Sequence, residues 1–266
     1  MYRKYLKHNL LGLCALAITA CGSASSSKDI SNSEIDARIT VDGEGNNVLI
    51  QADLQTVAPK FQGKPIRLST EDQLTANLDG EVAELTDTLA QEILDDGLIP
   101  LLLTSLLFSS DSTFVGGFNN NRDGAEVTVT LNRAGERAYG SVMMPDPVFM
   151  NAPSAADTFT AGDSISIVWT AGDPTRDVIL TIRSSCPVEN DQGIDNFYYS
   201  DSVSDTGIAT ISVNEIANQT RSQMPTGVNC TAEIRVARNE QGTTRGFGSG
   251  IITATQSANV AVNLIP

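Results

Sequence analysis

The sequence predicts an all-β protein built from two tandem β-sandwich domains. Short segments in which apolar and polar residues alternate recur along most of the chain, as expected for strands with one buried face. Turn residues separate these segments at intervals typical of sandwiches. A Met-Pro-Asp-Pro break at 144–147 divides the pattern into two parts of similar length. We therefore expect an N-terminal domain over 35–145 and a C-terminal domain over 146–266.

The N-terminal domain begins with a hairpin. Alternating residues over 35–41 and 48–52 flank the polar stretch 42–47, which predicts two antiparallel strands joined by a turn. The dipeptide Asp79-Gly80 is a second turn signal between alternating segments. Further strands are predicted over 65–68, 73–78, 81–85, 114–118, 126–131 and 138–143.

The stretch 88–108 interrupts this pattern as an insertion. Thr88 to Gln91 has capping-box spacing, so a short helix is predicted over 88–95. The strongly apolar stretch 98–108 that follows is too short to span a bilayer. Two interpretations are open: a buried strand or helix that caps the sandwich, or an exposed apolar surface for a partner or for acyl chains.

The C-terminal domain has the clearest strand pattern. Ile165, Ile167 and Trp169 share one parity, and Val178 to Ile182 forms the next alternating segment after a Pro-containing turn. Strands are also predicted over 198–203, 208–213, 230–236 and 248–255.

The stretch 164–170 and the segment 178–182 resemble strands B and C of fibronectin type III-like and immunoglobulin-like domains. That resemblance implies a core position for Trp169. The order differs from true immunoglobulin domains, because Trp169 precedes both Cys186 and Cys230. A bond between these cysteines is therefore expected to join the loop after the 178–182 strand to the 230–236 strand.

The N-terminus points to a cellular location. Basic residues at positions 3, 4 and 7 precede an apolar run over 10–20, which is the length of a signal-peptide core. Ile18-Thr19-Ala20-Cys21 resembles the lipobox of bacterial lipoproteins. The resemblance implies a signal peptide over 1–20, acyl chains such as palmitate on Cys21, and a lipid anchor in the membrane. The alternative is an ordinary secretory signal in which Cys21 has no role.

Residues after the cysteine extend this prediction. Gly22, in place of the Asp that favours inner-membrane retention in enterobacteria, indicates the outer membrane. The Ser-rich composition of 23–33 predicts a flexible lipidated tether over 21–34. The strand ending in Asn132-Arg133, the Met-Pro-Asp-Pro-Val-Phe link and the Trp-bearing sandwich with two cysteines also resemble a group of proteobacterial lipoproteins. No activity comes with that resemblance.

Composition excludes several functions. Without the three basic residues of the signal, 14 basic and 32 acidic residues remain, a net charge of about −18, so nucleic acid is not an expected partner. The single histidine, His8, lies in the signal, which excludes Ser-His-Asp catalysis and imidazole-bound zinc. Two cysteines remain, and in an oxidising compartment Cys186 and Cys230 are predicted to form a disulfide bond.

Acidic loops are candidate calcium sites. The stretch 119–124 mimics the first half of a calcium loop, but Thr130 stands where the closing Glu should be. The stretch 42–47 is a second cluster. The third contains Glu189, Asp191 and Asp195, the weak candidates for a metal site, and calcium is the only candidate cofactor. The alternative for each is a solvated β-turn.

Aromatic residues suggest a second kind of site. Phe197, Tyr198 and Tyr199 could form a platform for a glycan, and one of two adjacent aromatics on a strand should face outward. The alternative is packing at the sheet edge. Paired carboxylates could serve a glycosidase, but no pair stands out among the 32 acids.

These observations favour a membrane-anchored envelope lipoprotein with a non-enzymatic structural or interaction role. Its expected partners are the membrane, through the anchor, and an envelope protein or a glycan. The alternative function is a calcium- or glycan-binding adhesion module, and a carboxylate-based hydrolase is a third hypothesis.

Overall fold

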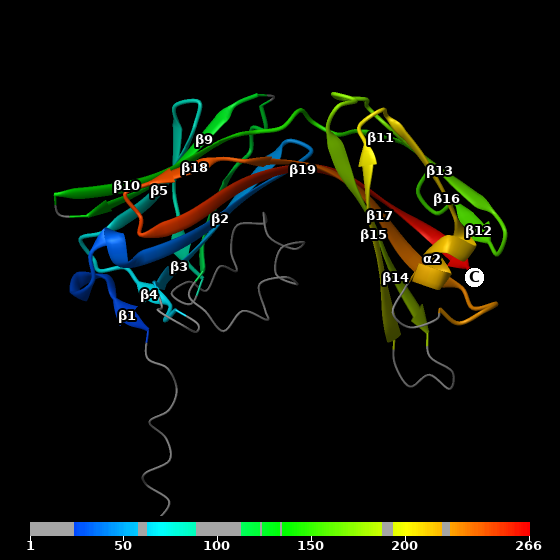
Figure 1. Cartoon of the computed structure of the whole chain (residues 1–266), viewed down its shortest axis with the longest axis horizontal. Helices are drawn as coiled ribbons and strands as arrows, with labels where there is room; N and C mark the ends of the chain where they lie inside the picture. Colours follow the sequence, from blue (N-terminus) through cyan, green and yellow to red (C-terminus); the bar gives the residue numbers. More distant parts are fainter. Residues whose placement is uncertain are drawn as a thin grey trace, which may run out of the picture.

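The computed structural model describes residues 24–57, 63–88, 113–122, 124–133, 135–187, 194–219 and 224–266. These residues form β-strands almost throughout, which confirms the predicted all-β class. Figure 1 shows two lobes joined by the long strand β19. Among the described residues, no helix combines the length and the apolar character needed to cross a bilayer.

The first lobe contains ten strands and two short 3-10 helices. The helices are η1 (Ser27–Asp29) and η2 (Asn32–Glu34). The strands are β1 (Ser25–Ser26), β2 (Ile35–Glu44), β3 (Asn47–Thr56), β4 (Ile66–Arg67), β5 (Gln73–Leu78), β6 (Glu81–Glu84), β7 (Thr86–Asp87), β8 (Thr113–Phe118), β9 (Glu126–Arg133) and β10 (Glu136–Met143). The predicted hairpin and the Asp79-Gly80 turn are both present, as β2–β3 and β5–β6.

Nine more strands and one helix follow along the chain, most of them in the second lobe. The strands are β11 (Met150–Ala152), β12 (Thr158–Thr160), β13 (Ser164–Trp169), β14 (Asp177–Pro187), β15 (Ile194–Ser204), β16 (Ile208–Ser212), β17 (Cys230–Gln241), β18 (Thr243–Arg245) and β19 (Ser249–Ile265). The helix is α2 (Val213–Gln219). Strand β18 returns to the first lobe and pairs with β10.

The first core lies between two sheets, so this lobe is a β-sandwich. One sheet has the order β18-β10-β9-β5-β6, and the other is the part of the nine-stranded sheet that runs β19-β2-β3-β8-β7. Side chains alternate along each strand, so every second side chain of each sheet points toward the facing sheet. The buried residues include Ile39, Ile50, Val127 and Leu131, all almost completely covered.

The second core also lies between two sheets. The sheet β11-β13-β16 faces the other end of the nine-stranded sheet, in the order β15-β14-β17-β19, and β12 adds to β19 in parallel. Trp169 on β13 is only 2% exposed and packs in this core, as the resemblance to strand B implies. In chain order β13 and β14 occupy the B and C positions of an immunoglobulin-like sandwich.

Strand β19 belongs to both sandwiches. Its first half pairs in parallel with β2, and most of its length pairs with β17 in antiparallel fashion. Ile252 and Ala254 contribute to the first core, whereas Val262 and Leu264 contribute to the second. The C-terminal residues thus complete the N-terminal sandwich, and the boundary between 145 and 146 stays a prediction.

Part of the N-terminal segment is ordered where a flexible tether was predicted. From Ser25 on, the residues assigned to a tether over 21–34 pack on the first sandwich. Ser27 is fully buried, where its hydroxyl donates to Asp72 and accepts from the Ser69 amide at 2.8 Å. Arg133 donates to the Ser27 carbonyl and to Asn32 Oδ1, the latter at 3.0 Å. Small polar residues that look flexible by composition become ordered here because hydrogen bonds to Asp72, Ser69 and Arg133 hold them on the sandwich.

Helix α2 and the ends of several strands also differ from the prediction. Strand β19, predicted over 248–255, continues to Ile265, and β17, predicted over 230–236, continues to Gln241. Helix α2 was not expected after the strand ending near 213, although Ser212 to Glu215 has capping-box spacing and Ser212 Oγ accepts from the Glu215 amide at 3.1 Å. Strand β14 continues past the predicted end at 182 to Pro187. The predicted helix from residue 89 on, and the apolar stretch 98–108, lie outside the described residues.

Candidate functional site

The outer face of the sheet β15-β14-β17-β19 carries an open groove. Residues of one parity on these strands face the second core, so their neighbours point to solvent. The groove has a volume of about 680 Å3. We call it the sheet groove; its lining residues with outward side chains are Arg183, Ser185, Asn196, Tyr198, Thr231, Glu233, Asn259 and Ala261.

Tyr198 is the aromatic residue of the sheet groove. Its side chain is 55% exposed, whereas Phe197 and Tyr199 turn into the second core. The Arg183 guanidinium lies 5.9 Å from the centroid of the Tyr198 ring, within range of a cation–π interaction. The prediction that one adjacent aromatic faces outward is correct, but the platform is a single tyrosine instead of three rings.

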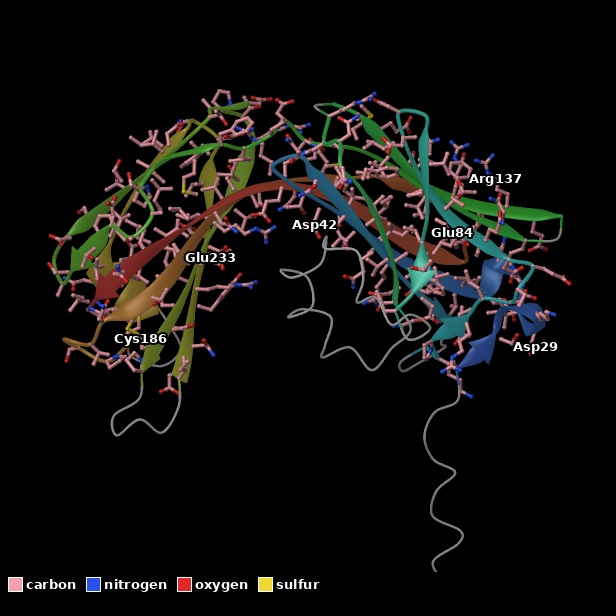
Figure 2. All side chains as sticks on the ribbon, turned by 180° about the vertical axis from the view of Figure 1, so that it is seen from behind. Asp29, Asp42, Glu84, Arg137, Cys186 and Glu233 are labelled. Atoms are coloured by element: carbon pink, nitrogen blue, oxygen red, sulfur yellow. A yellow bond between two sulfur atoms is a disulfide. The ribbon has the colours of Figure 1, made fainter. Side chains whose placement is uncertain are left out.

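Strand register places complementary groups in one row across the groove. Arg183 on β14 lies directly opposite Tyr198 on β15 and opposite Glu233 on β17. Asn259 on β19 donates to Glu233 Oε1 at 3.1 Å, which orients that carboxylate. Figure 2 shows Glu233 on this lobe. The row thus presents the Tyr198 ring, the N–H donors of the Arg183 guanidinium and the Glu233 carboxylate as an acceptor on one surface.

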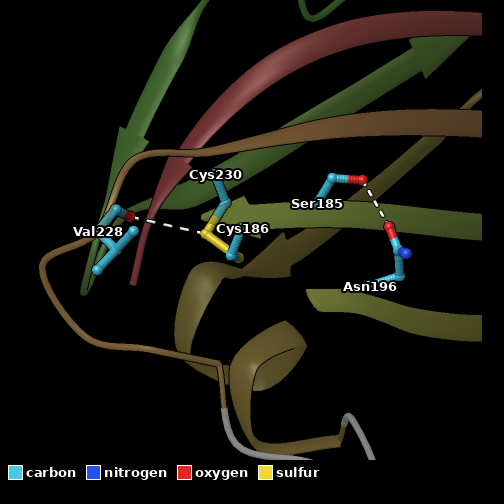
Figure 3. The surroundings of a disulfide bond; sticks show 5 residues. All are labelled: Ser185, Cys186, Asn196, Val228 and Cys230. Atoms are coloured by element: carbon cyan, nitrogen blue, oxygen red, sulfur yellow. Dashed lines mark hydrogen bonds between the residues drawn. A yellow bond between two sulfur atoms is a disulfide. The ribbon is translucent and has the colours of Figure 1, made fainter. Parts of the chain in front are cut away.

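The disulfide bond between Cys186 and Cys230 holds the two central strands of this sheet together (Figure 3). It confirms the predicted pairing. The predicted location is wrong, because Cys186 lies in β14 itself and not in a loop after it. Cys186 follows Ser185 and Cys230 precedes Thr231, the last registered pair of β14 and β17, and the Cα atoms of the two cysteines are 4.3 Å apart. The bond therefore fixes the sheet directly beneath the sheet groove.

The third acidic cluster is only partly described. Glu189 and Asp191 lie outside the described residues. Asp195 is exposed on β15 and pairs with Cys186 across the strands. No group of three or more His, Cys, Asp or Glu side chains that could hold a metal occurs in the described part of the chain.

The other two polar stretches meet in space. Asn121 donates from its side chain to the Gly45 carbonyl at 2.9 Å, and its main-chain amide donates to the Asn46 carbonyl. The Asn121 amide also exchanges two hydrogen bonds with the buried Gln256, at 2.6 and 2.9 Å. The polar atoms of the Asn121 side chain therefore hold the two turns against β19, which is a structural role for this residue.

Asp42 lies where the two lobes meet (Figure 2). Burial raises the pKa of the Asp42 carboxyl, while the charge of Arg235 and a hydrogen bond from Thr255 act in the opposite direction. Thr255 pairs with Asp42 across β19 and β2. Asp42 is thus placed among cross-strand partners on the same sheet as the sheet groove.

A buried ionic network was not predicted from the sequence. Asp205, between β15 and β16, accepts from Arg238 Nε at 2.6 Å and from Trp169 Nε1 at 2.8 Å. Arg238 also donates to the carbonyls of Asp146 at 3.1 Å, Pro147 at 2.8 Å and Thr170 at 2.6 Å. The network ties the link between the sandwiches to the second core.

The same network controls the ionisation of Asp205. Burial acts to raise its pKa, but hydrogen bonds from Arg238 and Trp169 and the charge of Arg238 outweigh burial. The pKa of Asp205 therefore lies below the ordinary value of an aspartate, and the carboxylate stays charged beside the guanidinium.

Comparison with known proteins does not assign the chain to a family. No family model and no curated protein matches the chain. Among solved structures, the chain is similar to the IG1 and IG2 domains of DIP-gamma, with 8% identity, 87% of this chain and 98% of that chain covered, and a TM-score of 0.22. It is similar to a chimeric titin Z1Z2 tandem, with 12% identity, coverages of 86% and 95%, and a TM-score of 0.22.

A third similar structure is the FN1–FN3 segment of chicken CNTN1, with 8% identity, coverages of 86% and 64%, and a TM-score of 0.20. With TM-scores this low, none of the three likenesses has a bearing on the function of this chain.

Proposed function

We propose that the protein is a lipid-anchored envelope protein that binds a glycan in the sheet groove. The observation that carries the binding role is the exposed Tyr198 ring, held by Arg183 in a row with Glu233. An isolated exposed tyrosine would be unremarkable. Here it borders an open groove whose other outward groups are hydroxyls, amides and charges.

The chemistry of this row suits a saccharide. A sugar ring presents an apolar C–H face and a rim of hydroxyls that both donate and accept hydrogen bonds. The free part of the Tyr198 ring would contact the C–H face, while Arg183 donates to and Glu233 accepts from the hydroxyls. Because the Cys186–Cys230 bond fixes the strands beneath, little ordering would oppose binding.

The anchor is proposed from the lipobox at Cys21. Only three residues, at positions 22–24, separate Cys21 from the first strand residue, Ser25. An extended chain of that length reaches roughly 10 to 15 Å. Acylation of Cys21 would therefore hold the first sandwich close to the membrane surface.

Replacing Tyr198 with Ala is expected to weaken glycan binding by about tenfold or more, because the ring is the central apolar contact. A glycan array identifies the ligand, and calorimetry with the best hit measures the affinity of wild type and Y198A. The matched control is Tyr139→Ala. Tyr139 also lies beside an arginine, with Arg137 at 5.6 Å, but on β10 of the first lobe.

The control should bind as tightly as wild type, and both variants should keep the wild-type circular dichroism spectrum. An array without a hit would contradict the glycan role. Equal losses for Tyr198→Ala and Tyr139→Ala would place the binding surface elsewhere.

Replacing Cys21 with Ser is expected to abolish labelling by a palmitate analogue and to release the protein from the membrane fraction. The reason is that serine lacks the thiol that accepts the diacylglyceryl group. Fractionation of cells that express either form measures this, with Cys186→Ala/Cys230→Ala as the control that keeps Cys21. If Cys21→Ser stays in the membrane fraction, the anchor does not depend on Cys21.

A further inference from the structure

One strand stands out among the sheet edges of the described chain. The terminal strands β18, β6, β11, β16 and β7, and the added strand β12, have two to five residues each. Short edges are one way in which proteins avoid unwanted pairing with other chains. Strand β15 is the terminal strand at the other end of the nine-stranded sheet, and it has 11 residues.

The outward backbone groups of β15 can be assigned. Cys186 and Cys230 face each other at a Cα separation of 4.3 Å, which is typical of a non-hydrogen-bonded pair. The backbone groups of Cys186 therefore point to β15, where Cys186 pairs with Asp195. Odd-numbered residues of β15 then bond to β14, and even-numbered residues direct their N–H and C=O groups outward.

A second observation agrees with this assignment. The N–H of Ser202 donates to the side chain of Asp201 at 2.8 Å. At Ser202 the outward donor is thus capped locally, whereas no such cap occurs at the described even-numbered positions from 194 to 200. Four consecutive outward positions remain available to a neighbouring strand.

Three of the devices that protect natural edges, namely proline, lysine and a bulge, are missing from β15. It contains neither proline nor lysine, and its register with β14 runs without a bulge from Ile194 to Ser204. All its even-numbered side chains are exposed, with Ile194 at 67% and Tyr198 at 55%. Among the described strands, only β14 pairs with β15.

We propose that β15 binds an extended, basic segment of a partner protein, which adds to the nine-stranded sheet as a further strand. The charge of the edge selects this occupant. Strand β15 carries Asp195 and Asp201 but no basic residue, and opposite charges across paired strands stabilise the pairing. A second copy of this chain is disfavoured, because it brings the same acidic strand and a net charge of −15.

This edge lies apart from the lipid anchor and adjoins the sheet groove at Tyr198. Ile194 and Tyr198 project from the groove side of β15, so an added strand would place alternate side chains beside them. Backbone pairing would supply affinity, and these two side chains would supply sequence preference.

Proline at position 200 tests the pairing directly. It removes the outward N–H of Ser200 but leaves the bonds between β14 and β15 intact, and proline is tolerated at sheet edges. The matched control is Ser200→Ala, which removes the same hydroxyl and keeps the N–H. Both variants should keep the wild-type melting temperature and the glycan affinity that depends on Tyr198.

The probe is a displayed library of random decapeptides, selected on the full chain after Cys21 with Cys21→Ser. We expect basic peptides with alternating β-branched residues, which bind Ser200→Ala like wild type and Ser200→Pro about tenfold more weakly or not at all. Amide hydrogen exchange at positions 196, 198 and 200 should slow in the complex.

Three outcomes would overturn the proposal: the selection yields no binding peptide, the selected peptides bind Ser200→Pro as tightly as Ser200→Ala, or sedimentation shows a dimer of this chain that Ser200→Pro dissociates. The last result would assign the edge to self-association. Ser200 does not line the sheet groove, so Ser200→Pro tests the edge alone and the failures of the two proposals are distinguishable.

Discussion

Replacing Arg238 with Ala is expected to destabilise the second sandwich by about 3 to 5 kcal/mol. The change leaves the Asp205 carboxylate buried with only the Trp169 indole and backbone groups as donors, and an unpaired buried charge is costly. It also removes the donors to the carbonyls of Asp146, Pro147 and Thr170. Urea unfolding followed by fluorescence measures the loss. Trp169 is the only tryptophan, so the signal reports the second core.

The control is an ion pair of the same chemistry on the surface. Arg176 pairs with Glu240, but its side chain is 62% exposed. Replacing Arg176 with Ala should cost less than about 1 kcal/mol, because water solvates both charges once the pair is broken. A loss for Arg238→Ala as small as that for Arg176→Ala would contradict the structural role of the network.

The pH dependence of the difference gives an independent check. The folded pKa of Asp205 lies below the unfolded value of about 3.9, so the pair contributes its stability above that value. The contribution is lost as pH falls through the lower, folded pKa. Without Arg238, burial alone would favour the neutral acid. The stability gap between wild type and the variant should therefore be widest near neutral pH and narrow in strong acid.

Local patterns in the sequence were sufficient to predict most strands. The β2–β3 hairpin and strands β13 and β14 follow from alternation, because one buried face requires a period of two. The spacing of Ser212 and Glu215 is also a local signal for helix α2. It was missed because the alternating pattern over 208–213 predicted a strand there. Such features depend only on neighbours in the chain.

What could not be predicted depends on pairing between distant residues. The double role of β19 follows from its register with β2, more than 200 residues earlier in the chain. Asp205 and Arg238 are 33 residues apart and have no local signature. For the sheet groove, alternation predicts that one of Tyr198 and Tyr199 faces outward. The register of β15, β14 and β17 then places Arg183 and Glu233 beside it.

Removing the Cys186–Cys230 bond is expected to destabilise the second sandwich by about 4 kcal/mol, since the bond closes a loop of 44 residues in the unfolded chain. The variant is Cys186→Ala/Cys230→Ala in the Cys21→Ser background, which carries no other thiol after the signal. Urea unfolding monitored by Trp169 measures the change.

Treatment of the Cys21→Ser protein with dithiothreitol is the matched control, because it reduces the same disulfide bond without replacing either cysteine. Both routes should lower the unfolding midpoint to a similar value, and amide exchange should accelerate first in β14 and β15, at the end of the sheet that the bond fixes. Loss of the disulfide bond should also lower the glycan affinity, because the strands that it joins position Tyr198, Arg183 and Glu233. An unchanged midpoint would contradict the prediction. It would mean that the backbone hydrogen bonds between β14 and β17 hold these strands together, and keep the sheet groove rigid, without the disulfide bond.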